Sequence, residues 1–177
     1  MICLTQFNTP VGVMRAAATD EGICLFDFEY RRSIDTIMKR IETTLGDTFT
    51  EAEHPHFATL KQEIGEYFTG IRKTFDVPLH LVGTAFQKSV WQGLLQIPYG
   101  DTRSYKQQSI FLGNEKAIRA VAGANGENGI AIIVPCHRVI GENGSLVGYG
   151  GGLQRKKWLL DHERKYSGRS AQAELFV

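Results

Sequence analysis

The sequence gathers its most reactive side chains in the run IIVPCHRVIG, residues 132–141, where Cys136 stands between Pro135 and His137. A lone cysteine after an apolar run is most often a buried structural residue. Here, however, His137 and Arg138 are costly to bury without partners, which argues against a plain core segment. A free thiol titrates at about 8.5, so a nucleophile at neutral pH requires a nearby base or positive charge. Because His137 can be that base, the pair predicts a thiol nucleophile.

Coupling between the two side chains depends on the backbone that carries them. Adjacent residues of an extended strand point to opposite faces, so Cys136 and His137 can cooperate only across a turn or through a bridging water. Glu163 lies at the edge of the apolar face of a later helical segment and can orient the histidine. The three residues would then form a Cys/His/Glu relay of the kind that thiol proteases use.

The composition limits what the whole chain can be. With 177 residues, 42% of them hydrophobic, it can bury one good core or a main domain with a smaller one packed against it. It contains no apolar run long enough for a bilayer, and its N-terminus lacks the features of a signal peptide, so we expect a cytoplasmic protein, or a nuclear one in a eukaryote. Three cysteines without a close pair argue against a disulfide framework or a zinc knuckle.

Charge is distributed unevenly along the chain. The net charge is only +1, but residues 1–85 hold 8 Lys/Arg against 12 Asp/Glu, whereas residues 86–177 hold 12 against 7. The first part therefore carries −4 and the second +5. An imbalance of this size also occurs on ordinary surfaces, but it favours a C-terminal part that faces a polyanion.

The N-terminal part has the pattern of a small α/β module. Turn residues at 20–22 separate two apolar stretches, and apolar residues then recur at helical spacing. We expect a strand, a turn and a strand over 9–30, a helix from its cap Ser33 to Gly46, a helix from after His56 to Gly70, and a short edge strand over 76–83.

The C-terminal part is predicted to be mostly helical. We expect a helix from its cap Thr84 to a break at 98–101, a helix from its cap Ser104 through Leu112, a left-handed Gly113, and a helix after its cap Asn114 over 115–123. A short buried strand-like run should follow at 130–134, and then a hairpin turn at Asn143-Gly144. The chain should end in a helix over 153–165 and a loosely ordered tail over 166–177.

Two of these helices, joined at Leu112-Gly113-Asn114, have the form of a helix-turn-helix. Most such helix pairs are only packing units, so the pattern alone is weak. The second helix, KAIRAVAGA, adds to it because alanines such as Ala117 and Ala120 surround a single long side chain, Arg119. Small side chains allow the backbone of this helix to approach a partner closely.

At this point the sequence resembles a known family. The core VPCHRVIG is followed by GYGGGLQRKKWLLDHE and preceded by FQKSVWQGLLQIPYGDTRSY, SYKQQS and NEKAIRAVAGANGEN, over about Phe86 to Glu163. These segments are similar to the O6-alkylguanine-DNA alkyltransferases, also called methylated-DNA-protein-cysteine methyltransferases. The resemblance implies an α+β fold, with a ribonuclease-H-like α/β module at 1–83 and a mostly helical domain with a DNA-binding helix-turn-helix at 84–177.

The resemblance also implies catalytic roles. Cys136 would take the alkyl group from guanine O6 by in-line displacement. His137 would act through a water as its base, and Glu163 would orient His137. Tyr105 would hydrogen-bond a guanine ring nitrogen, so that the base leaves without full anionic charge, and would help to rotate the phosphate of the lesion.

On the DNA side, the resemblance implies that Arg119 fills the gap left when the damaged nucleotide is flipped out of the duplex. Ala117, Ala120 and Asn114 would let the helix lie in the minor groove. The expected partner is double-stranded DNA with an alkylated guanine. We expect a monomer that has no cofactor and no membrane contact, and cooperative binding to DNA is left open.

Further residues would build the substrate pocket. The resemblance makes Asn128 a hinge between the recognition helix and the Cys136 segment, and Tyr149 a wall of the pocket. The carbonyls of Cys136 and Val139 would accept from the guanine amino group.

Three positions depart from the family pattern: Gly150 replaces a common Ser or Ala, Ile118 a common Ala, and Gly129 the usual Pro. Gly150 lacks a hydroxyl that could contact O6, although its backbone N–H remains. We expect the two glycines to loosen the walls around the site, and the preferred alkyl group to depend on this.

Two other functions are weighed against alkyl transfer. Alkyltransferase-like lesion sensors bind the flipped base without chemistry, but they have lost the cysteine that this chain keeps. A thiol hydrolase would use Cys136, His137 and Glu163 but would leave Arg119 and the helix pair without a purpose. Some family members carry a structural zinc; Cys3, Cys24 and His80 do not form a convincing ligand set, and we expect no metal.

Overall fold

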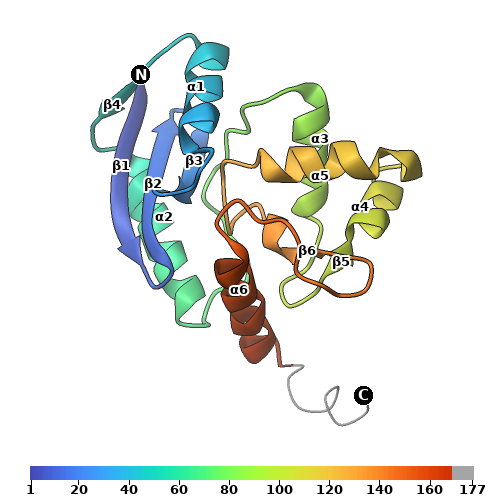
Figure 1. The fold of residues 1–177 in the computed structure, drawn as a ribbon. Helices are drawn as coiled ribbons and strands as arrows, with labels where there is room; N and C mark the ends of the chain where they lie inside the picture. The colour runs from blue at the N-terminus through green and yellow to red at the C-terminus, as the bar shows by residue number, and fades with distance from the viewer. Residues whose placement is uncertain (169–177) are drawn as a thin grey trace.

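The computed structural model describes residues 1–168, in which a four-stranded sheet lies beside a group of helices (Figure 1). The sheet has the order β3-β2-β1-β4; β1 pairs antiparallel with β2 and parallel with β4, and β2 pairs antiparallel with β3. Its strands are β1 (Ile2–Thr9), β2 (Gly12–Thr19), β3 (Gly22–Phe28) and β4 (Phe49–Glu51).

Helices cover both faces of this sheet. Strand β3 is buried along its whole length, so its side chains face apolar layers on both sides. Helix α1 (Ile34–Leu45) shares one buried cluster with Leu25, through Ile37 and Ile41. Helix α2 (Pro55–Phe68) shares the other cluster with Phe26. Because neighbouring residues of a strand point to opposite faces, α1 and α2 lie on opposite sides of β3.

The second part of the chain is built mainly from helices (Figure 1). Two strands of two residues each, β5 and β6, lie among these helices and pair in parallel. The elements are α3 (Ala85–Leu94), β5 (Arg103–Ser104), α4 (Tyr105–Phe111), the 3-10 helix η1 (Glu115–Ala117), α5 (Ile118–Gly126), the 3-10 helix η2 (Cys136–Arg138), β6 (Val139–Ile140) and α6 (Leu153–Tyr166).

The two parts are joined by backbone hydrogen bonds as well as by side chains. Phe26 of β3 donates its N–H to the carbonyl of Gly129 at 2.8 Å and accepts from the N–H of Ala131 at 2.7 Å. His162 of α6 bonds the carbonyl of Tyr67 at the end of α2 at 2.7 Å. The segment that leads to Cys136 is therefore anchored on the first sheet.

Several expectations are confirmed. The fold is α+β, with the sheet in the N-terminal part and helices in the C-terminal part. The hairpin over 9–30 is β2 and β3. Helices α3 and α4 begin at capping boxes formed by Thr84 and Ser104, and Gly46 and Gly113 adopt positive φ angles of 64° and 79° at the ends of α1 and α4.

Two strand predictions are wrong. Residues 76–83 do not form a strand; only Leu79 bridges to Ile23, because Pro78 has no N–H to extend a ladder. The run 130–134 is not a strand either, since it bridges to Phe26 at Ile130 and then turns. The prediction also missed β1, whose outer residues are partly exposed and so break the apolar pattern.

Smaller corrections concern turns and helix ends. Ser33 and Asn114 precede their helices without a side-chain capping bond, and η1 separates Asn114 from α5, which continues to Gly126. Helix α2 begins at Pro55, with His54 as its cap. A turn forms over residues 141–144, closed by the bond from the N–H of Gly144 to the carbonyl of Gly141; β6 precedes it but no strand follows among the described residues, so it is not a hairpin. Of the expected loose tail, Tyr166 ends α6 and residues 169–177 lie outside the described residues.

Within residues 1–168, every helix is too short or too polar to cross a membrane.

Candidate active site

Cys136 opens the 3-10 helix η2, directly after Pro135. Successive side chains of a 3-10 helix are turned by about a third of a circle, so Cys136 and His137 point in different directions without lying on opposite faces. The cysteine is 9% exposed and His137 is fully buried. The sequence required either a turn at this point or a bridging water, and η2 is such a turn. No hydrogen bond joins the two side chains among residues 1–168.

The side chain of Asn128 ties the loop before Cys136 into one unit. Its Oδ1 accepts from the N–H of Ile130 at 2.9 Å, and its Nδ2 donates to the carbonyl of Val134 at 2.9 Å and to Cys136 Sγ at 3.3 Å. Between these contacts Ile132 adopts a φ of 73°, which costs a β-branched residue about 1–3 kcal/mol. The loop is therefore held in a strained shape by the residue that contacts the thiol.

Glu163 on α6 is the centre of a buried polar network. The carboxylate, 1% exposed, bonds His137 Nε2 at 2.7 Å and accepts from Arg138 Nε and Nη2, both at 2.9 Å. The hydroxyl of Tyr67 also donates to it at 2.9 Å. Burial alone would raise the pKa of Glu163, but His137 and Arg138 hold it well below its ordinary range, so the carboxylate is ionised.

This network fixes the state of the histidine. Burial lowers the pKa of His137 despite the nearby carboxylate, so the ring is neutral at rest. Since the ionised Glu163 can only accept, the proton of the ring is assigned to Nε2. Nδ1 is then an acceptor, and it is buried without a hydrogen-bond partner among residues 1–168. His137 thus keeps a free basic nitrogen.

Cys136 lies in the wall of a small cavity of about 90 Å³. Three buried polar atoms around it have no hydrogen-bond partner among the described residues, namely the hydroxyl of Tyr149 and both amide atoms of Asn125. Such atoms are rare in folded proteins and often await a ligand or water. The cavity is lined by Tyr105, Ala122, Asn125, Gly126, Cys136, Gly148, Tyr149 and Gly150.

The thiol is not ionised at rest. Burial and, to a smaller extent, the Asp27 carboxylate raise the pKa of Cys136, and together they outweigh the amide of Asn128 and the positive charges of Arg31 and Lys156, which lower it. Burial also raises the pKa of Tyr105, whose hydroxyl donates to the carbonyl of Val147 at 3.1 Å. The site therefore holds a protonated nucleophile, a neutral base and a phenol that can donate.

The glycine-rich loop over the cavity is held by a lysine that sequence reasoning missed. Lys156 is fully buried, and its Nζ donates to the carbonyls of Val139, Val147 and Gly148 at 2.5, 3.0 and 3.1 Å. Burial lowers its pKa to about 8. One of the two acceptor positions of the Val139 carbonyl is thus already used. In the sequence Lys156 stands in a charged run, which gives no signal of burial.

The space beside Gly150 and Gly129, two of the positions that depart from the family pattern, is filled by neighbouring side chains; the expected loosening of the walls stays a prediction. A Cβ at Gly150 would lie 2.6 Å from Arg31 Nη2, and one at Gly129 would lie 2.8 Å from Ile37 Cγ2. Both neighbours belong to the N-terminal part of the chain. Sequence reasoning also missed Arg31; its partner Asp27, a charge inside the apolar strand GICLFDF, was the available signal.

The helix pair α4 and α5 adjoins the cavity and presents its small residues outward. Arg119, Ala120 and Asn114 are exposed and Ala117 is half-buried. Arg119 has no hydrogen bond or ion pair among residues 1–168, so its charge is available to a partner. Ile118, the third departure, is 38% exposed on the same helix.

Other candidate sites carry less chemistry. Within residues 1–168, no three His, Cys, Asp or Glu side chains come together as metal ligands would. A larger hollow of about 660 Å³ runs along β1 and β4, but none of its lining residues is a cysteine or a histidine.

Comparison with known sequence families gives two matches that together span most of the chain. Residues 2–81 match the family described as 6-O-methylguanine DNA methyltransferase, ribonuclease-like domain. Residues 85–165 match 6-O-methylguanine DNA methyltransferase, DNA binding domain.

Individual relatives and solved structures agree with this. A methylated-DNA–protein-cysteine methyltransferase of Methanosarcina acetivorans is 45% identical over 89% of this chain and 95% of its own. The constitutive enzyme of that name from Bacillus subtilis is 49% identical over 90% and 94%. The crystal structure of Mycobacterium tuberculosis OGT in complex with DNA superposes with a TM-score of 0.79 at 38% identity, covering 93% of this chain and 94% of that one.

Proposed function

The chain belongs to the 6-O-methylguanine DNA methyltransferase family, and we propose that it repairs DNA by moving the alkyl group of O6-alkylguanine onto the sulfur of its own Cys136. The observation that carries this proposal is the position of Cys136. Its thiol lines a small cavity between the helix pair and the buried His137–Glu163 network.

The transfer requires three coordinated steps. The thiol gives its proton to Nδ1 of His137 through a water, and Glu163 stabilises the resulting imidazolium. The sulfur then attacks the alkyl carbon in line with the C–O6 bond, forming an S–C bond as that bond breaks. The electron pair left on O6 spreads into the guanine ring, where the hydroxyl of Tyr105 donates to a ring nitrogen and limits the anionic charge.

The product explains why one chain would act once. A thioether is a very poor leaving group, and no step above removes it, so Cys136 stays alkylated. The number of lesions repaired should therefore equal the number of protein molecules.

Access to the lesion requires that the nucleotide leave the duplex, because O6 lies on the major-groove edge of a stacked base, where Cys136 at the wall of its cavity cannot reach it. We assign α5 to the minor groove, with Ala117 and Ala120 allowing close approach and Asn114 near the backbone. Arg119, whose charge is free, would fill the gap left by the flipped nucleotide.

The pocket around the base would be shaped by four further residues, namely Asn128, Val139, Tyr149 and Gly150. The protein would act as a monomer and without a cofactor, in the compartment that holds the DNA. Its two domains would be residues 1–83 and 84–177.

The two rival functions explain fewer of these features. A lesion sensor has no use for Cys136 beside a neutral histidine whose second nitrogen is free. A thiol hydrolase leaves the unpartnered Arg119 and the helix pair unexplained. The relatives named above are methyltransferases.

Loss of the lesion from DNA tests the proposal. A duplex with one O6-methylguanine is incubated with increasing amounts of protein, and the remaining O6-methylguanine is measured by chromatography of the nucleosides. We expect a linear loss that ends at one lesion per chain, and no loss with Cys136→Ser. Continued turnover, or cleavage of the DNA or a peptide instead, would refute it.

A further inference from the structure

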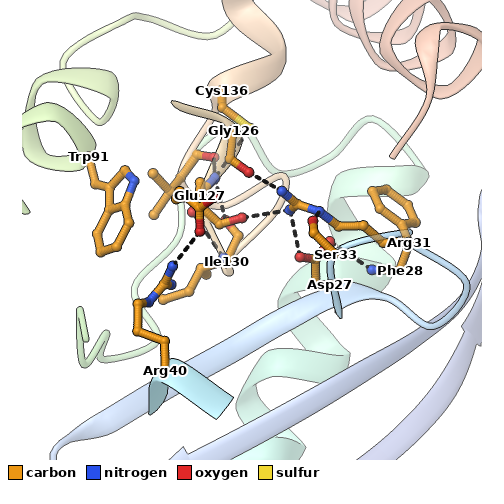
Figure 2. Close-up of polar contacts among 12 residues, drawn as sticks. Asp27, Phe28, Arg31, Ser33, Arg40, Trp91, Gly126, Glu127, Ile130 and Cys136 are labelled. Carbon is orange, nitrogen blue, oxygen red and sulfur yellow. Dashed lines mark hydrogen bonds and ion pairs between the residues drawn. The ribbon is translucent and has the colours of Figure 1, made fainter. Parts of the chain in front are cut away.

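Arg31 is a buried cation that joins the two parts of the chain beside the cavity. It follows β3 and is 7% exposed. Figure 2 shows its guanidinium between Asp27 and Ser33 of the N-terminal part and Gly126 of the C-terminal part. Nη1 donates to Asp27 Oδ2 at 2.7 Å, Nε donates to Ser33 Oγ at 2.9 Å, and Nη2 donates to the carbonyl of Gly126.

The N-terminal contacts fix this guanidinium rigidly. Asp27 is fully buried, and its other oxygen, Oδ1, accepts from the N–H of Phe28 at 2.9 Å. A buried ion pair gains little net stability, because both ions lose their hydration. Its value here is that Arg31 presents the remaining donors in one direction, toward the C-terminal part.

Those donors hold the backbone on which the thiol depends. Arg31 Nη1 also donates to the carbonyl of Asn128 at 2.8 Å. Asn128 is the residue whose side chain donates to Cys136 Sγ, and Gly126 lines the cavity at the end of α5. The guanidinium therefore fixes the end of the DNA-facing helix and the loop of the nucleophile at the same time.

Arg31 also lies behind the cavity wall at Gly150. A Cβ at this position would come within 2.6 Å of Nη2 and 2.5 Å of Nε, closer than real side-chain contacts allow. Gly150 thus fits here because Arg31 fills the space that a larger residue would take. The positive charge is near enough to Cys136 to lower the pKa of the thiol, against burial and against the nearby Asp27 carboxylate, which both raise it.

We propose that Arg31 is a positioning residue for alkyl transfer, which holds the Asn128 amide against the sulfur and is matched to glycine at position 150. The inference rests on the proposed function in that alkyl transfer is the reaction it serves. A displacement of reacting groups by about 1 Å can lower a rate about 100-fold, so a loss of about tenfold is expected without Arg31.

The test compares Arg31→Met with Arg31→Lys and with a matched control, Arg40→Met. Arg40 also crosses from α1 to the C-terminal part, donating to Glu127 Oε2 at 3.1 Å and lying over Trp91 (Figure 2), but among residues 1–168 it donates no hydrogen bond to Asn128 or Gly150. The first readout is the rate of methyl transfer from duplex DNA. The second is the rate at which iodoacetamide modifies Cys136 as a function of pH, followed by peptide mass.

We expect Arg31→Met to slow transfer about tenfold and to shift the iodoacetamide profile to higher pH, because the charge that favours the thiolate is gone. Arg31→Lys should recover part of both effects, and Arg40→Met should change neither by more than about twofold. If Arg31→Met and Arg40→Met change both readouts equally, Arg31 serves only folding and the inference is wrong.

A double-mutant cycle with Gly150→Ala covers the case in which Arg31→Met fails to fold. Gly150→Ala alone should displace the guanidinium and reproduce the shifted pH profile, and it should add little to Arg31→Lys or Arg31→Met. An unshifted profile in Gly150→Ala would overturn the inference. Since iodoacetamide needs no DNA, absence of methyl transfer in the unaltered protein would refute the proposed function but leave the role of Arg31 at Cys136 measurable.

Discussion

The two sides of Cys136 differ in how their buried polar groups are satisfied. Behind the cysteine, the Glu163 carboxylate is bonded by His137, Arg138 and Tyr67, and the unpartnered Nδ1 of His137 is the nitrogen that the proposed transfer uses as a base. In front of it, the hydroxyl of Tyr149 and the amide of Asn125 have no partner among residues 1–168.

This difference indicates which side of the cysteine supports the catalytic residues and which side recognises the substrate. A buried polar group without a partner costs about 1–3 kcal/mol, so a folded protein rarely keeps one unless a ligand or water meets it. A satisfied network, in contrast, fixes the orientation of its members before any ligand arrives. We infer that the Glu163 side holds the base ready and that the cavity side receives the flipped nucleotide.

Removing the charge of Glu163 should break the supporting side most severely. In Glu163→Gln the buried Arg138 loses its counter-ion, so unfolding should require about 3 kcal/mol less free energy. Methyl transfer should slow about 100-fold, because the imidazolium of His137 is no longer stabilised. Urea unfolding and transfer rates measure both effects. Asp161→Asn is the control on the same helix, since its pairs with Lys157 and Arg164 are exposed and should contribute less than about 1 kcal/mol.

The same side should make the protein sensitive to acid. The pKa of Glu163 is lower in the folded protein than its ordinary value of 4.5, so its contribution is complete above that pH and is lost as the pH falls below it. Burial also keeps the pKa of His137 below its ordinary 6.5 in the folded protein. The unfolded chain therefore takes up a proton at this residue before the folded protein does, and stability again falls as the pH drops below 6.5. Unfolding temperatures measured from pH 7 to 3 should fall, and the gap to Glu163→Gln should narrow below about pH 4.5. A constant gap would contradict this assignment.

Two tyrosines permit a matched test of the comparison. Tyr67→Phe removes a hydroxyl that donates to Glu163 and should destabilise the fold by about 1.5–3 kcal/mol. Tyr149→Phe removes an unpartnered hydroxyl from the cavity wall, so it should not destabilise the fold and should stabilise it by up to about 1–3 kcal/mol. Urea unfolding of both variants decides the matter; equal losses would mean that the two sides do not differ.

Alkylation should disturb the cavity side on its own. The methyl group on Cys136 has to fit beside the Asn128 amide, which is packed against Sγ at 3.3 Å, so the product should be less stable than the free protein by about 1–3 kcal/mol. Calorimetry before and after reaction measures this. A product that melts no lower would show that the cavity has room for the transferred group.

Arg119 should have the smallest effect on stability, because it is exposed and has no partner among residues 1–168. Arg119→Ala should leave unfolding within about 0.5 kcal/mol of the original and leave iodoacetamide modification of Cys136 unchanged. Transfer from duplex DNA should nevertheless slow at least about tenfold, since flipping costs a few kcal/mol that the inserted side chain offsets. Arg119→Lys, which keeps the charge, separates insertion of a long planar side chain from simple attraction to phosphate.

The sequence predicted the parts of this site that are local or carried by a specific motif. Capping residues such as Thr84 and Ser104 and the left-handed Gly113 mark the helices because their backbone requirements are local. The contact of His137 with Glu163 could be expected because both residues belong to the motif that the family shares.

The prediction missed contacts that depend on residues far apart in the chain. Arg31 meets Asn128 only because β3 lies under the loop before Cys136, and no spacing in the sequence encodes that approach. In the sequence Lys156 cannot be told from a surface lysine, because its burial depends on the glycine-rich loop that folds over it. The run at 130–134 has the apolar residues of a strand, but its bonds to Asn128 and Phe26 bend it into turns.

The most direct test of the central claim is where the alkyl group goes. The protein is mixed with an excess of duplex containing one O6-methylguanine, and its intact mass and peptide masses are measured. We predict a gain of a single CH2 unit per chain, located on the peptide of Cys136 and absent in Cys136→Ser. A gain on another residue, more than one group per chain, or repair without any change in mass would contradict it.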